Sequence, residues 1–371
     1  MTLPTGESPI SFSQLRTEFG TNGNNTNGPV RLGQYRRDDS DFTKPPATSS
    51  HTNDPLDTGI PTSGTINMDV FHGKKLNVIV DYHTTAFTGG SRPSDARTKY
   101  ESSSSGNWSV IGGYKNRNAS DSSGTRVKIN VNKTIGGDTS TSSESSELDR
   151  CALRTGSGWE TGTELYVTVG ASGKICGAGG AGGKGGWKTG TAGADGKDGT
   201  SALGIQYGTD DNETVVDIAS GGIISCGYGG GGGGAGCEEG SEEEGEESGF
   251  GGGGGGGAGV PAGAAGEGGN QGLGDADAEA GSTPDGSSET GGEGHAGGND
   301  GGNETGGTGG DGGDQAGNAA DGAQGDAEPS GVGEGGATGS AIRKTDANIK
   351  WNFSTGSAAR TFGSTTDNGI A

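Results

Sequence analysis

Between Gly177 and Gly339 the chain consists largely of glycine, with unbroken runs at Gly229–Gly234 and Gly251–Gly257. Glycine has no side chain to bury, and its backbone loses more conformational entropy on ordering than that of any other residue. Such a segment either stays disordered or packs main chain against main chain. The second outcome is a polyproline-II-type helix with three residues per turn, whose backbone groups are satisfied by neighbouring segments.

The amino-acid composition shows that much of the chain lacks the residues of a hydrophobic core. Of 371 residues, 87 are glycine and only 26% are hydrophobic, whereas an ordinary domain is about 45–50% apolar with glycine included. Within residues 238–340 the branched aliphatic side chains are Val260, Leu273 and Val332, which excludes a globular core there. We therefore expect one small conventional β core and a long remainder that lacks one.

The charge distribution excludes two classes of partner. The formal net charge is -23, and neither Lys nor Arg occurs between Lys197 and Arg343. Nucleic acids and anionic bilayers both require basic clusters, so neither is expected as a partner. No apolar run approaches the ~20 residues of a membrane span, and membrane insertion is not expected either.

Residues 1–73 have the pattern of an attachment arm. Ser11 and Gln14 form a capping-box signature that predicts a short helix at Phe12–Phe19, and a second short helix is indicated at Ile66–Gly73. A polar linker, Thr21–Pro61, separates them. Because neither helix can bury its apolar face alone, we expect both to dock on a partner protein or another copy. The docking candidates are Phe12, Leu15, Phe19, Ile66, Met68 and Phe71.

Residues 74–175 are predicted to be β. Short β-branched and aromatic runs alternate with polar turns, which is typical of a sandwich or a half-open sheet. These runs are Leu76–Tyr82, Trp108–Tyr114, Arg126–Asn132, Leu148–Arg154 and Leu165–Val169. Arg126–Asn132 alternates strictly, which predicts one wet face.

An internal repeat follows the β region. Val167–Val169 with Ile175 matches Val216–Ile218 with Ile224, and each unit runs into a glycine-rich segment. This repeat predicts two units stacked as layers that bury their valines and isoleucines together. Aromatic and basic residues return in 341–371, which indicates a closing strand or a lid over the glycine region.

The residues do not favour catalysis or a bound metal. The four histidines share no Ser or Cys motif, so no enzymatic activity, cofactor or metal is expected. Gly297–Glu304 has some features of a calcium-binding repeat but lacks the aliphatic residue that each turn requires, and a solvated acidic face is the alternative. The four cysteines are expected to be small buried hydrophobes, with a Cys226–Cys237 or Cys176–Cys226 bridge as the other interpretation.

Four aromatic residues within or beside the glycine region are candidates for receptor contact: Trp187, Tyr207, Tyr228 and Phe250. Ring faces suit sugars and protein loops. The alternative is that each ring caps an end of the glycine bundle.

Several segments resemble proteins of tailed bacteriophages. Ile10–Gly20 and Ser63–Gly73 resemble N-terminal segments of tail-fibre and related virion proteins, while Gly177–Gly186 and Ser220–Gly234 are similar to the glycine-rich domains of phage receptor-binding proteins. The resemblance implies a host-recognition adhesin whose glycine segments form bundled polyglycine-II helices. The acidic run Glu238–Glu247 departs from that pattern, and we expect it to be an exposed loop.

Together these observations predict a mainly β chain with little α-helix. We expect four parts: a virion attachment arm (1–73), a β domain (74–175), a polyglycine-II domain (176–340) and a closing segment (341–371). The expected function is a tail-fibre or tail-tip adhesin that recognises a glycan or outer-membrane protein of a bacterium. Its arm would bind other phage tail or baseplate proteins, and homotrimers assembled in the host cytoplasm are expected. The alternatives are a connector without receptor contact and a calcium-dependent acidic matrix protein.

Overall fold

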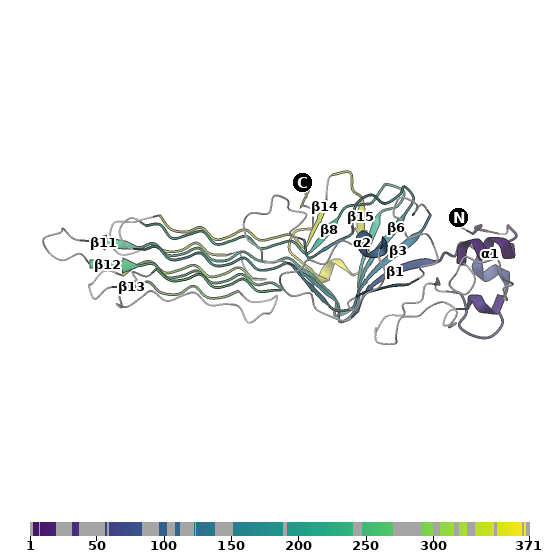
Figure 1. Ribbon diagram of the computed structural model, residues 1–371, viewed down its shortest axis with the longest axis horizontal. Helices are drawn as coiled ribbons and strands as arrows, with labels where there is room; N and C mark the ends of the chain where they lie inside the picture. The colour runs from purple at the N-terminus through teal and green to yellow at the C-terminus, as the bar shows by residue number, and fades with distance from the viewer. Residues whose placement is uncertain are drawn as a thin grey trace.

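The structure is a computed structural model of the chain and has three parts along one long axis (Figure 1). An N-terminal module around helix α1 lies at one end, a stack of β-strands lies in the middle, and a bundle of glycine-rich segments extends to the other end. The chain is mainly β, as the sequence predicts. The structure describes residues 3–6, 8–19, 32–36, 56–57, 59–83, 96–101, 108–111, 122, 124–137, 151–187, 191–239, 247–269, 291–299, 305–314, 319–324, 331–344, 347–365 and 367–368.

Helix α1 spans Phe12–Phe19, as the sequence predicts. The Ser11 N–H donates to Gln14 Oε1 at 2.7 Å, and the Gln14 N–H donates to Ser11 Oγ at 3.2 Å. These two bonds are the reciprocal pair of a capping box. The second predicted helix is a shorter 3₁₀ helix, η2 (Met68–Phe71), and Gly73 follows it with φ of 65°.

The apolar faces of these two helices pack against each other, so neither helix needs another protein to bury its apolar face, and docking of the module on a partner stays a prediction. The ring centroids of Phe19 and Phe71 lie 5.7 Å apart. The predicted polar linker contributes a third element, the 3₁₀ helix η1 (Leu32–Tyr35), whose Tyr35 ring lies 5.9 Å from that of Phe19. A few apolar residues spaced along that linker therefore complete a small core that neither helix could form alone.

The β stack consists of three sheets whose strands are parallel, apart from β2. In the first sheet the strand order is β15-β9-β6-β3-β1-β2, with β1 Asn77–Tyr82, β2 Trp108–Ile111, β3 Arg126–Val131, β6 Glu164–Val169, β9 Thr214–Ile218 and β15 Trp351–Phe353. The second sheet contains β4 Thr134–Gly136, β7 Lys174–Cys176, β10 Ile223–Ser225 and β16 Thr361–Phe362. The third contains β5 Leu153–Arg154, β8 Leu203–Ile205, β14 Ile342–Lys344 and β17 Asp367–Asn368. Helix α2 (Ala96–Glu101) packs near β1, and a 3₁₀ helix, η5 (Ala358–Arg360), precedes β16.

The internal repeat is realised as neighbouring layers of this stack. Val167 pairs with Val216, and Ile175 pairs with Ile224. From β3 onward each layer contributes one strand to each of the three sheets, so the chain winds around a shared apolar interior. Of the two expected architectures, a sandwich or a half-open sheet, the sandwich is not formed, because the strands pair in parallel with the next layer.

The interior of the stack is the principal hydrophobic core of the described residues. Along β6 the side chains of Leu165, Val167 and Val169 are fully buried, while the residues between them are half-buried. Burying one such aliphatic side chain contributes about 1.5–3 kcal/mol. This core therefore anchors the glycine segments that leave from β7 and β10.

The C-terminal tail completes the stack and does not cover the glycine region. Strand β14 pairs with β8 and completes the layer of β9 and β10. Strands β15, β16 and β17 then add a last layer beside β9, β10 and β14. The rings of Trp351 and Phe353 meet edge to face at 4.9 Å and pack on the core. The aromatic residues of the tail thus fill the open end of the apolar interior.

The glycine-rich segments form a bundle in which each main chain pairs with several others. Three consecutive N–H groups of the central segment donate to three different segments: Gly230 to Lys197 O at 2.9 Å, Gly231 to Gly255 O at 2.8 Å, and Gly232 to Ala320 O at 3.0 Å. The next residue, Gly233, returns to the first neighbour through Ala194 O. The hydrogen bonds therefore rotate among the neighbours with a period of three residues, and a side chain would separate the main chains.

The four cysteines are buried and form no disulfide, in agreement with the prediction of small buried hydrophobes. Cys226 lies with Tyr228 and Ala258 where the bundle joins the β stack. Burial raises the pKa of the Cys226 thiol to about 11, because a thiolate loses its hydration there. The thiol is therefore neutral and packs as an apolar group.

Candidate functional site

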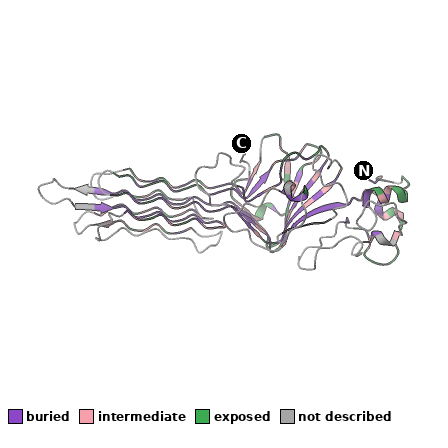
Figure 2. Ribbon diagram, viewed as in Figure 1, coloured by how far each residue is buried: buried purple, intermediate pink, exposed green. Residues whose placement is uncertain are grey.

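Two large apolar side chains are exposed among the described residues, and they lie at opposite ends of the molecule. Phe12, on the outer face of α1, is 46% exposed, and Trp187, at the far end of the bundle, is 44% exposed. Figure 2 shows the exposed face of α1 in green at one end, while the strands of the stack and the inner bundle segments are buried. Exposed aromatic residues are typical anchors of protein interfaces, so each end offers a candidate contact.

The far end of the bundle is closed by a small antiparallel sheet. Its strands are β11 (Cys237–Glu239), β12 (Glu247–Phe250) and β13 (Gly298–Asn299). Cys237 and Phe250 are buried there, and the Cys237 thiol donates to Thr305 O at 3.4 Å. The acidic run falls mostly on residues 240–246, which lie outside the described residues.

Trp187 is positioned beside this sheet. The preceding residue, Gly186, donates its N–H to Gly234 O at 2.8 Å, and the Trp187 carbonyl lies next to Gly236. The backbone around Trp187 is therefore held by the bundle, while its side chain is partly exposed. A fixed main chain under an exposed indole lowers the entropy cost of a contact.

The three other predicted receptor residues bury their rings. Tyr207 lies in the core of the β stack, and its hydroxyl donates to Glu160 O at 3.0 Å. Tyr228 packs on Cys226 at the near end of the bundle, where burial raises the pKa of its phenol. Phe250 lies 2% exposed at the far end. Tyr228 and Phe250 therefore occupy the two ends of the bundle, which is the alternative placement that the sequence left open.

The predicted docking residues also divide by exposure. Leu15, Phe19 and Phe71 are buried in the module's own core, and Ile66 and Met68 are half-buried against it. These five residues build the module, and Phe12 remains on its surface. A role of these residues in virion docking stays a prediction.

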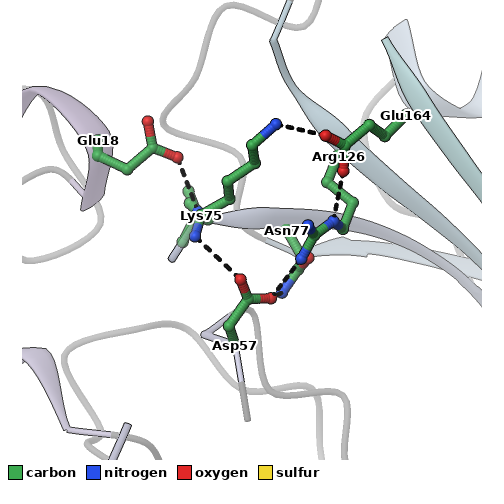
Figure 3. A network of polar contacts seen from close by, with 7 residues as sticks. Glu18, Asp57, Lys75, Asn77, Arg126 and Glu164 are labelled. Carbon is green, nitrogen blue, oxygen red and sulfur yellow. Dashed lines mark hydrogen bonds and ion pairs between the residues drawn. The ribbon is translucent and has the colours of Figure 1, made fainter. Parts of the chain in front are cut away.

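A polar network joins the N-terminal module to the β stack (Figure 3). Asp57 accepts hydrogen bonds from Arg126 Nη1 at 2.7 Å, from the Lys75 N–H at 3.0 Å and from Asn77 Nδ2 at 3.1 Å. Arg126 Nε also donates to Glu164 Oε2 at 2.8 Å, and Lys75 Nζ forms an ion pair with the same carboxylate. The network ties the start of β1 to β3 and β6.

Helix α1 connects to the same place. Glu18, at its C-terminal end, is 1% exposed, and its Oε1 accepts the Leu76 N–H at 2.8 Å. The residue after Leu76 begins β1, so α1 is fixed directly to the start of that strand. The contacts of Glu18, Asp57 and Lys75 together hold the N-terminal module against the first sheet.

The sequence patterns did not single out this network. Arg126 and Glu164 are cross-strand partners in the register of β3 and β6, and opposite charges at paired positions are a recognisable signal once two strands are known to be neighbours. Asp57 lies in the predicted linker, and its partner Arg126 is 69 residues away. The sequence around either residue does not predict this contact.

The carboxyl group of Glu164 is expected to make stability depend on pH. Partial burial alone raises its pKa, but hydrogen bonds from Lys75 and Arg126 outweigh burial and hold the pKa below the usual 4.5. A lowered folded-state pKa gives stability that is present above pH 4.5 and is lost as the pH falls through the folded pKa.

Glu164→Gln should therefore cost about 2 kcal/mol at neutral pH, and this cost should shrink as the pH falls below 4.5. Denaturant unfolding of both proteins between pH 3 and pH 7 measures the difference. Because the other carboxyl groups are common to both, they cancel in the comparison. A difference that stays constant over this range would contradict the assignment.

The described part of the chain has a small polar hollow, but neither a metal-binding cluster nor a membrane-spanning helix. A polar hollow of about 40 Å³ is lined by residues that include Asp198, Ser201 and Arg343, and it has room for little more than one or two waters. Within the described ranges no group of three or more His, Cys, Asp or Glu residues could hold a metal ion. The helices that the structure describes are too short and polar to cross a membrane.

Comparisons with known proteins give one family. The profile of the family described as "Phage tail fibre adhesin Gp38" matches residues 96–366, well over half of the chain. Among solved structures, the crystal structure of the gp37-gp38 adhesin tip complex of the bacteriophage S16 long tail fiber is similar at 20% sequence identity, with a TM-score of 0.35, over 82% of this chain and 88% of that chain. None of the curated proteins matches the chain.

Proposed function

The chain belongs to the phage tail fibre adhesin Gp38 family, and we propose that it recognises a bacterial surface receptor through the far end of its glycine bundle. The observation that carries this proposal is the partly exposed side chain of Trp187, held on a fixed backbone next to Gly236 and β11. Strands β11, β12 and β13 lie at the end remote from the N-terminal module (Figure 1). The receptor is a glycan or an outer-membrane protein, because an indole face suits both sugars and protein loops.

The glycine bundle acts as a stiff spacer of polyglycine-II helices. Its three-residue rotation of hydrogen bonds supports this interpretation, since a polyproline-II-type helix has three residues per turn and no internal hydrogen bonds. Glycine at close-packed positions allows each main chain to bond to several neighbours. The spacer presents the far end without a hydrophobic core, which explains the composition of residues 176–340.

The N-terminal module attaches the chain to other phage tail or baseplate proteins, with Phe12 as the exposed contact. Residues 1–73 serve as the attachment arm, residues 74–175 and 341–371 supply the β support, and the protein resides in the virion tail.

A family of tail adhesins is a structural, non-catalytic kind of protein. Assembly as a homotrimer stays a prediction, which the mass of the purified chain in solution tests.

Two alternative functions predict different results in binding and melting experiments. A connector without receptor contact would bind other tail proteins but would not bind bacteria. A calcium-dependent matrix protein would lose stability in EDTA, whereas the adhesin should melt at the same temperature with and without it.

The two exposed aromatic residues provide a matched pair for testing the proposal. Labelled full-length chain is incubated with a panel of bacterial strains, and a strain that retains it is used for the variants. Trp187→Ala should lower the affinity for cells at least tenfold, as expected for an anchor worth about 1.4 kcal/mol or more. Phe12→Ala should leave cell binding unchanged and weaken assembly onto tail particles. Equal cell binding by the parent and Trp187→Ala, with both folded, would rule out the assigned contact.

A further inference from the structure

On the perimeter of the glycine bundle, some backbone N–H groups donate to side chains instead of to another main chain. In the outer segment 331–339, Gly333, Gly336 and Gly339 donate inward to carbonyl groups of segment 227–236. The N–H groups between them point to other sides of the segment. On a side without another main chain, such a group would have only water as an acceptor.

Aspartate side chains fill these positions. The carboxylate of Asp195 accepts the Glu334 N–H at 2.9 Å, and that of Asp198 accepts the Ala337 N–H at 2.8 Å. In return, the glycine after each aspartate donates to the same residue: Gly196 to Glu334 O at 2.8 Å and Gly199 to Ala337 O at 2.9 Å. Each Asp-Gly dipeptide therefore makes a two-way bond with one residue of the neighbouring segment.

The arrangement recurs where the two segments run in opposite directions. Asp311 accepts the Gly294 N–H at 2.8 Å, while Gly312 donates to Gly292 O at 2.8 Å. Asp321 accepts the Gly335 N–H at 2.8 Å, while Gly322 donates to Gly333 O at 2.9 Å. In both pairs the accepted N–H belongs to the residue two positions after the accepting carbonyl. The Asp-Gly dipeptide therefore makes this two-way bond with a neighbouring segment that runs either parallel or antiparallel to it.

The distribution of aspartate along the bundle agrees with this role. The uninterrupted glycine runs 229–234 and 251–257 are buried throughout. Each Asp-Gly dipeptide in the bundle that the structure describes lies instead on an outer segment, with the aspartate exposed. The two buried runs obtain their acceptors from backbone carbonyls, and the outer segments use aspartate side chains in addition to backbone carbonyls.

We propose that the Asp-Gly dipeptide is the unit that closes the perimeter of the bundle, with the carboxylate replacing the carbonyl of an absent neighbouring segment. Asp195, Asp198, Asp311 and Asp321 are then structural acceptors and not ligands for a cation or a receptor. Unpaired N–H groups along an edge are a template for pairing with another chain, and these carboxylates occupy that edge.

Site-resolved hydrogen exchange of the full-length protein tests the proposal at single amides. Asp198→Ala should speed exchange of the Ala337 amide about tenfold, because a hydrogen bond to a charged acceptor is lost. The Glu334 amide, served by Asp195, should keep its rate in the same variant. Asp195→Ala should show the reverse pattern.

Two further variants separate the acceptor from its charge. Asp198→Asn retains an oxygen at the same position, so the Ala337 amide should keep its protection. Glu267→Ala removes an equal charge from an exposed ion pair with Lys184 and should change neither amide. The proposal is overturned if Asp198→Ala leaves the Ala337 rate unchanged, or if Asp198→Asn speeds it as much as alanine does.

Discussion

Replacing Gly231 with alanine is expected to disrupt the glycine bundle, lowering the free energy of unfolding of that region by about 3 kcal/mol. The N–H of Gly231 donates to Gly255 O, and its carbonyl accepts the Gly183 N–H, both at 2.8 Å. A Cβ atom at this position would lie 1.9 Å from Gly310 O. The obstacle is backbone, so two hydrogen-bonded segments would have to separate to admit one methyl group.

Gly331→Ala is the matched control, because it adds the same methyl group to an exposed position of the bundle. The nearest heavy atom to a Cβ there is the Ala192 Cβ at 3.4 Å, an ordinary contact. Hydrogen exchange across residues 227–258 and the rate of limited proteolysis measure both variants. Only Gly231→Ala should accelerate them, and equal protection in the two variants would refute the assignment of Gly231 to a close-packed interior.

Local signals in the sequence were sufficient for the elements that depend on local chemistry. The capping pair Ser11 and Gln14 placed helix α1 correctly, because a cap and its helix lie within a few residues of each other. The repeat of Val167–Val169 in Val216–Ile218 correctly predicted stacked layers, because identical spacing brings identical faces together.

The architecture of the stack could not be predicted in the same way. Strand β15 pairs with β9 although residues 219–350, which include both long glycine runs, separate them in the sequence. Short apolar runs show that strands exist, but they do not show which strands are neighbours or whether they are parallel. The prediction of a sandwich or a half-open sheet rested on short apolar runs separated by polar turns, which leave the pairing of the strands undetermined.

Candidate contact residues were only partly accessible to sequence reasoning. Trp187 and Tyr228 are both aromatic residues among glycines, yet one is exposed and the other is buried. Their difference arises from position along the bundle, since Tyr228 faces Ala258 beside the stack while Trp187 lies at the far end. A sequence that is nearly uniform in glycine does not indicate how far along the bundle a residue lies.

The largest effect outside the bundle is expected at the joint between the N-terminal module and the stack. Asp57→Ala should lower the free energy of unfolding by about 3 kcal/mol. The Asp57 side chain is 11% exposed and accepts from three donors, one of them the Arg126 guanidinium. Its removal leaves two buried neutral donors and part of a positive charge without acceptors, which costs more than the hydrogen bonds alone contribute.

Glu101→Ala is a suitable comparison, since it also removes a carboxylate paired with an arginine. The Arg97–Glu101 pair joins residues one helical turn apart at 3.3 Å, with about a third of each side chain exposed. An exposed pair of this kind contributes about 0.5 kcal/mol or less. Chemical denaturation of both variants at neutral pH should therefore separate them clearly.

The loss at Asp57 should also change how the protein unfolds. The network connects β1, β3 and β6 to the segment that α1 holds through Glu18, so in the parent protein the module and the stack should melt together. With Asp57→Ala, the module should exchange its amides and become sensitive to protease before the stack does. If both parts of the variant still unfold in one transition at the parent's midpoint, the network is not what couples them, and the aromatic core around Phe19 must carry that role.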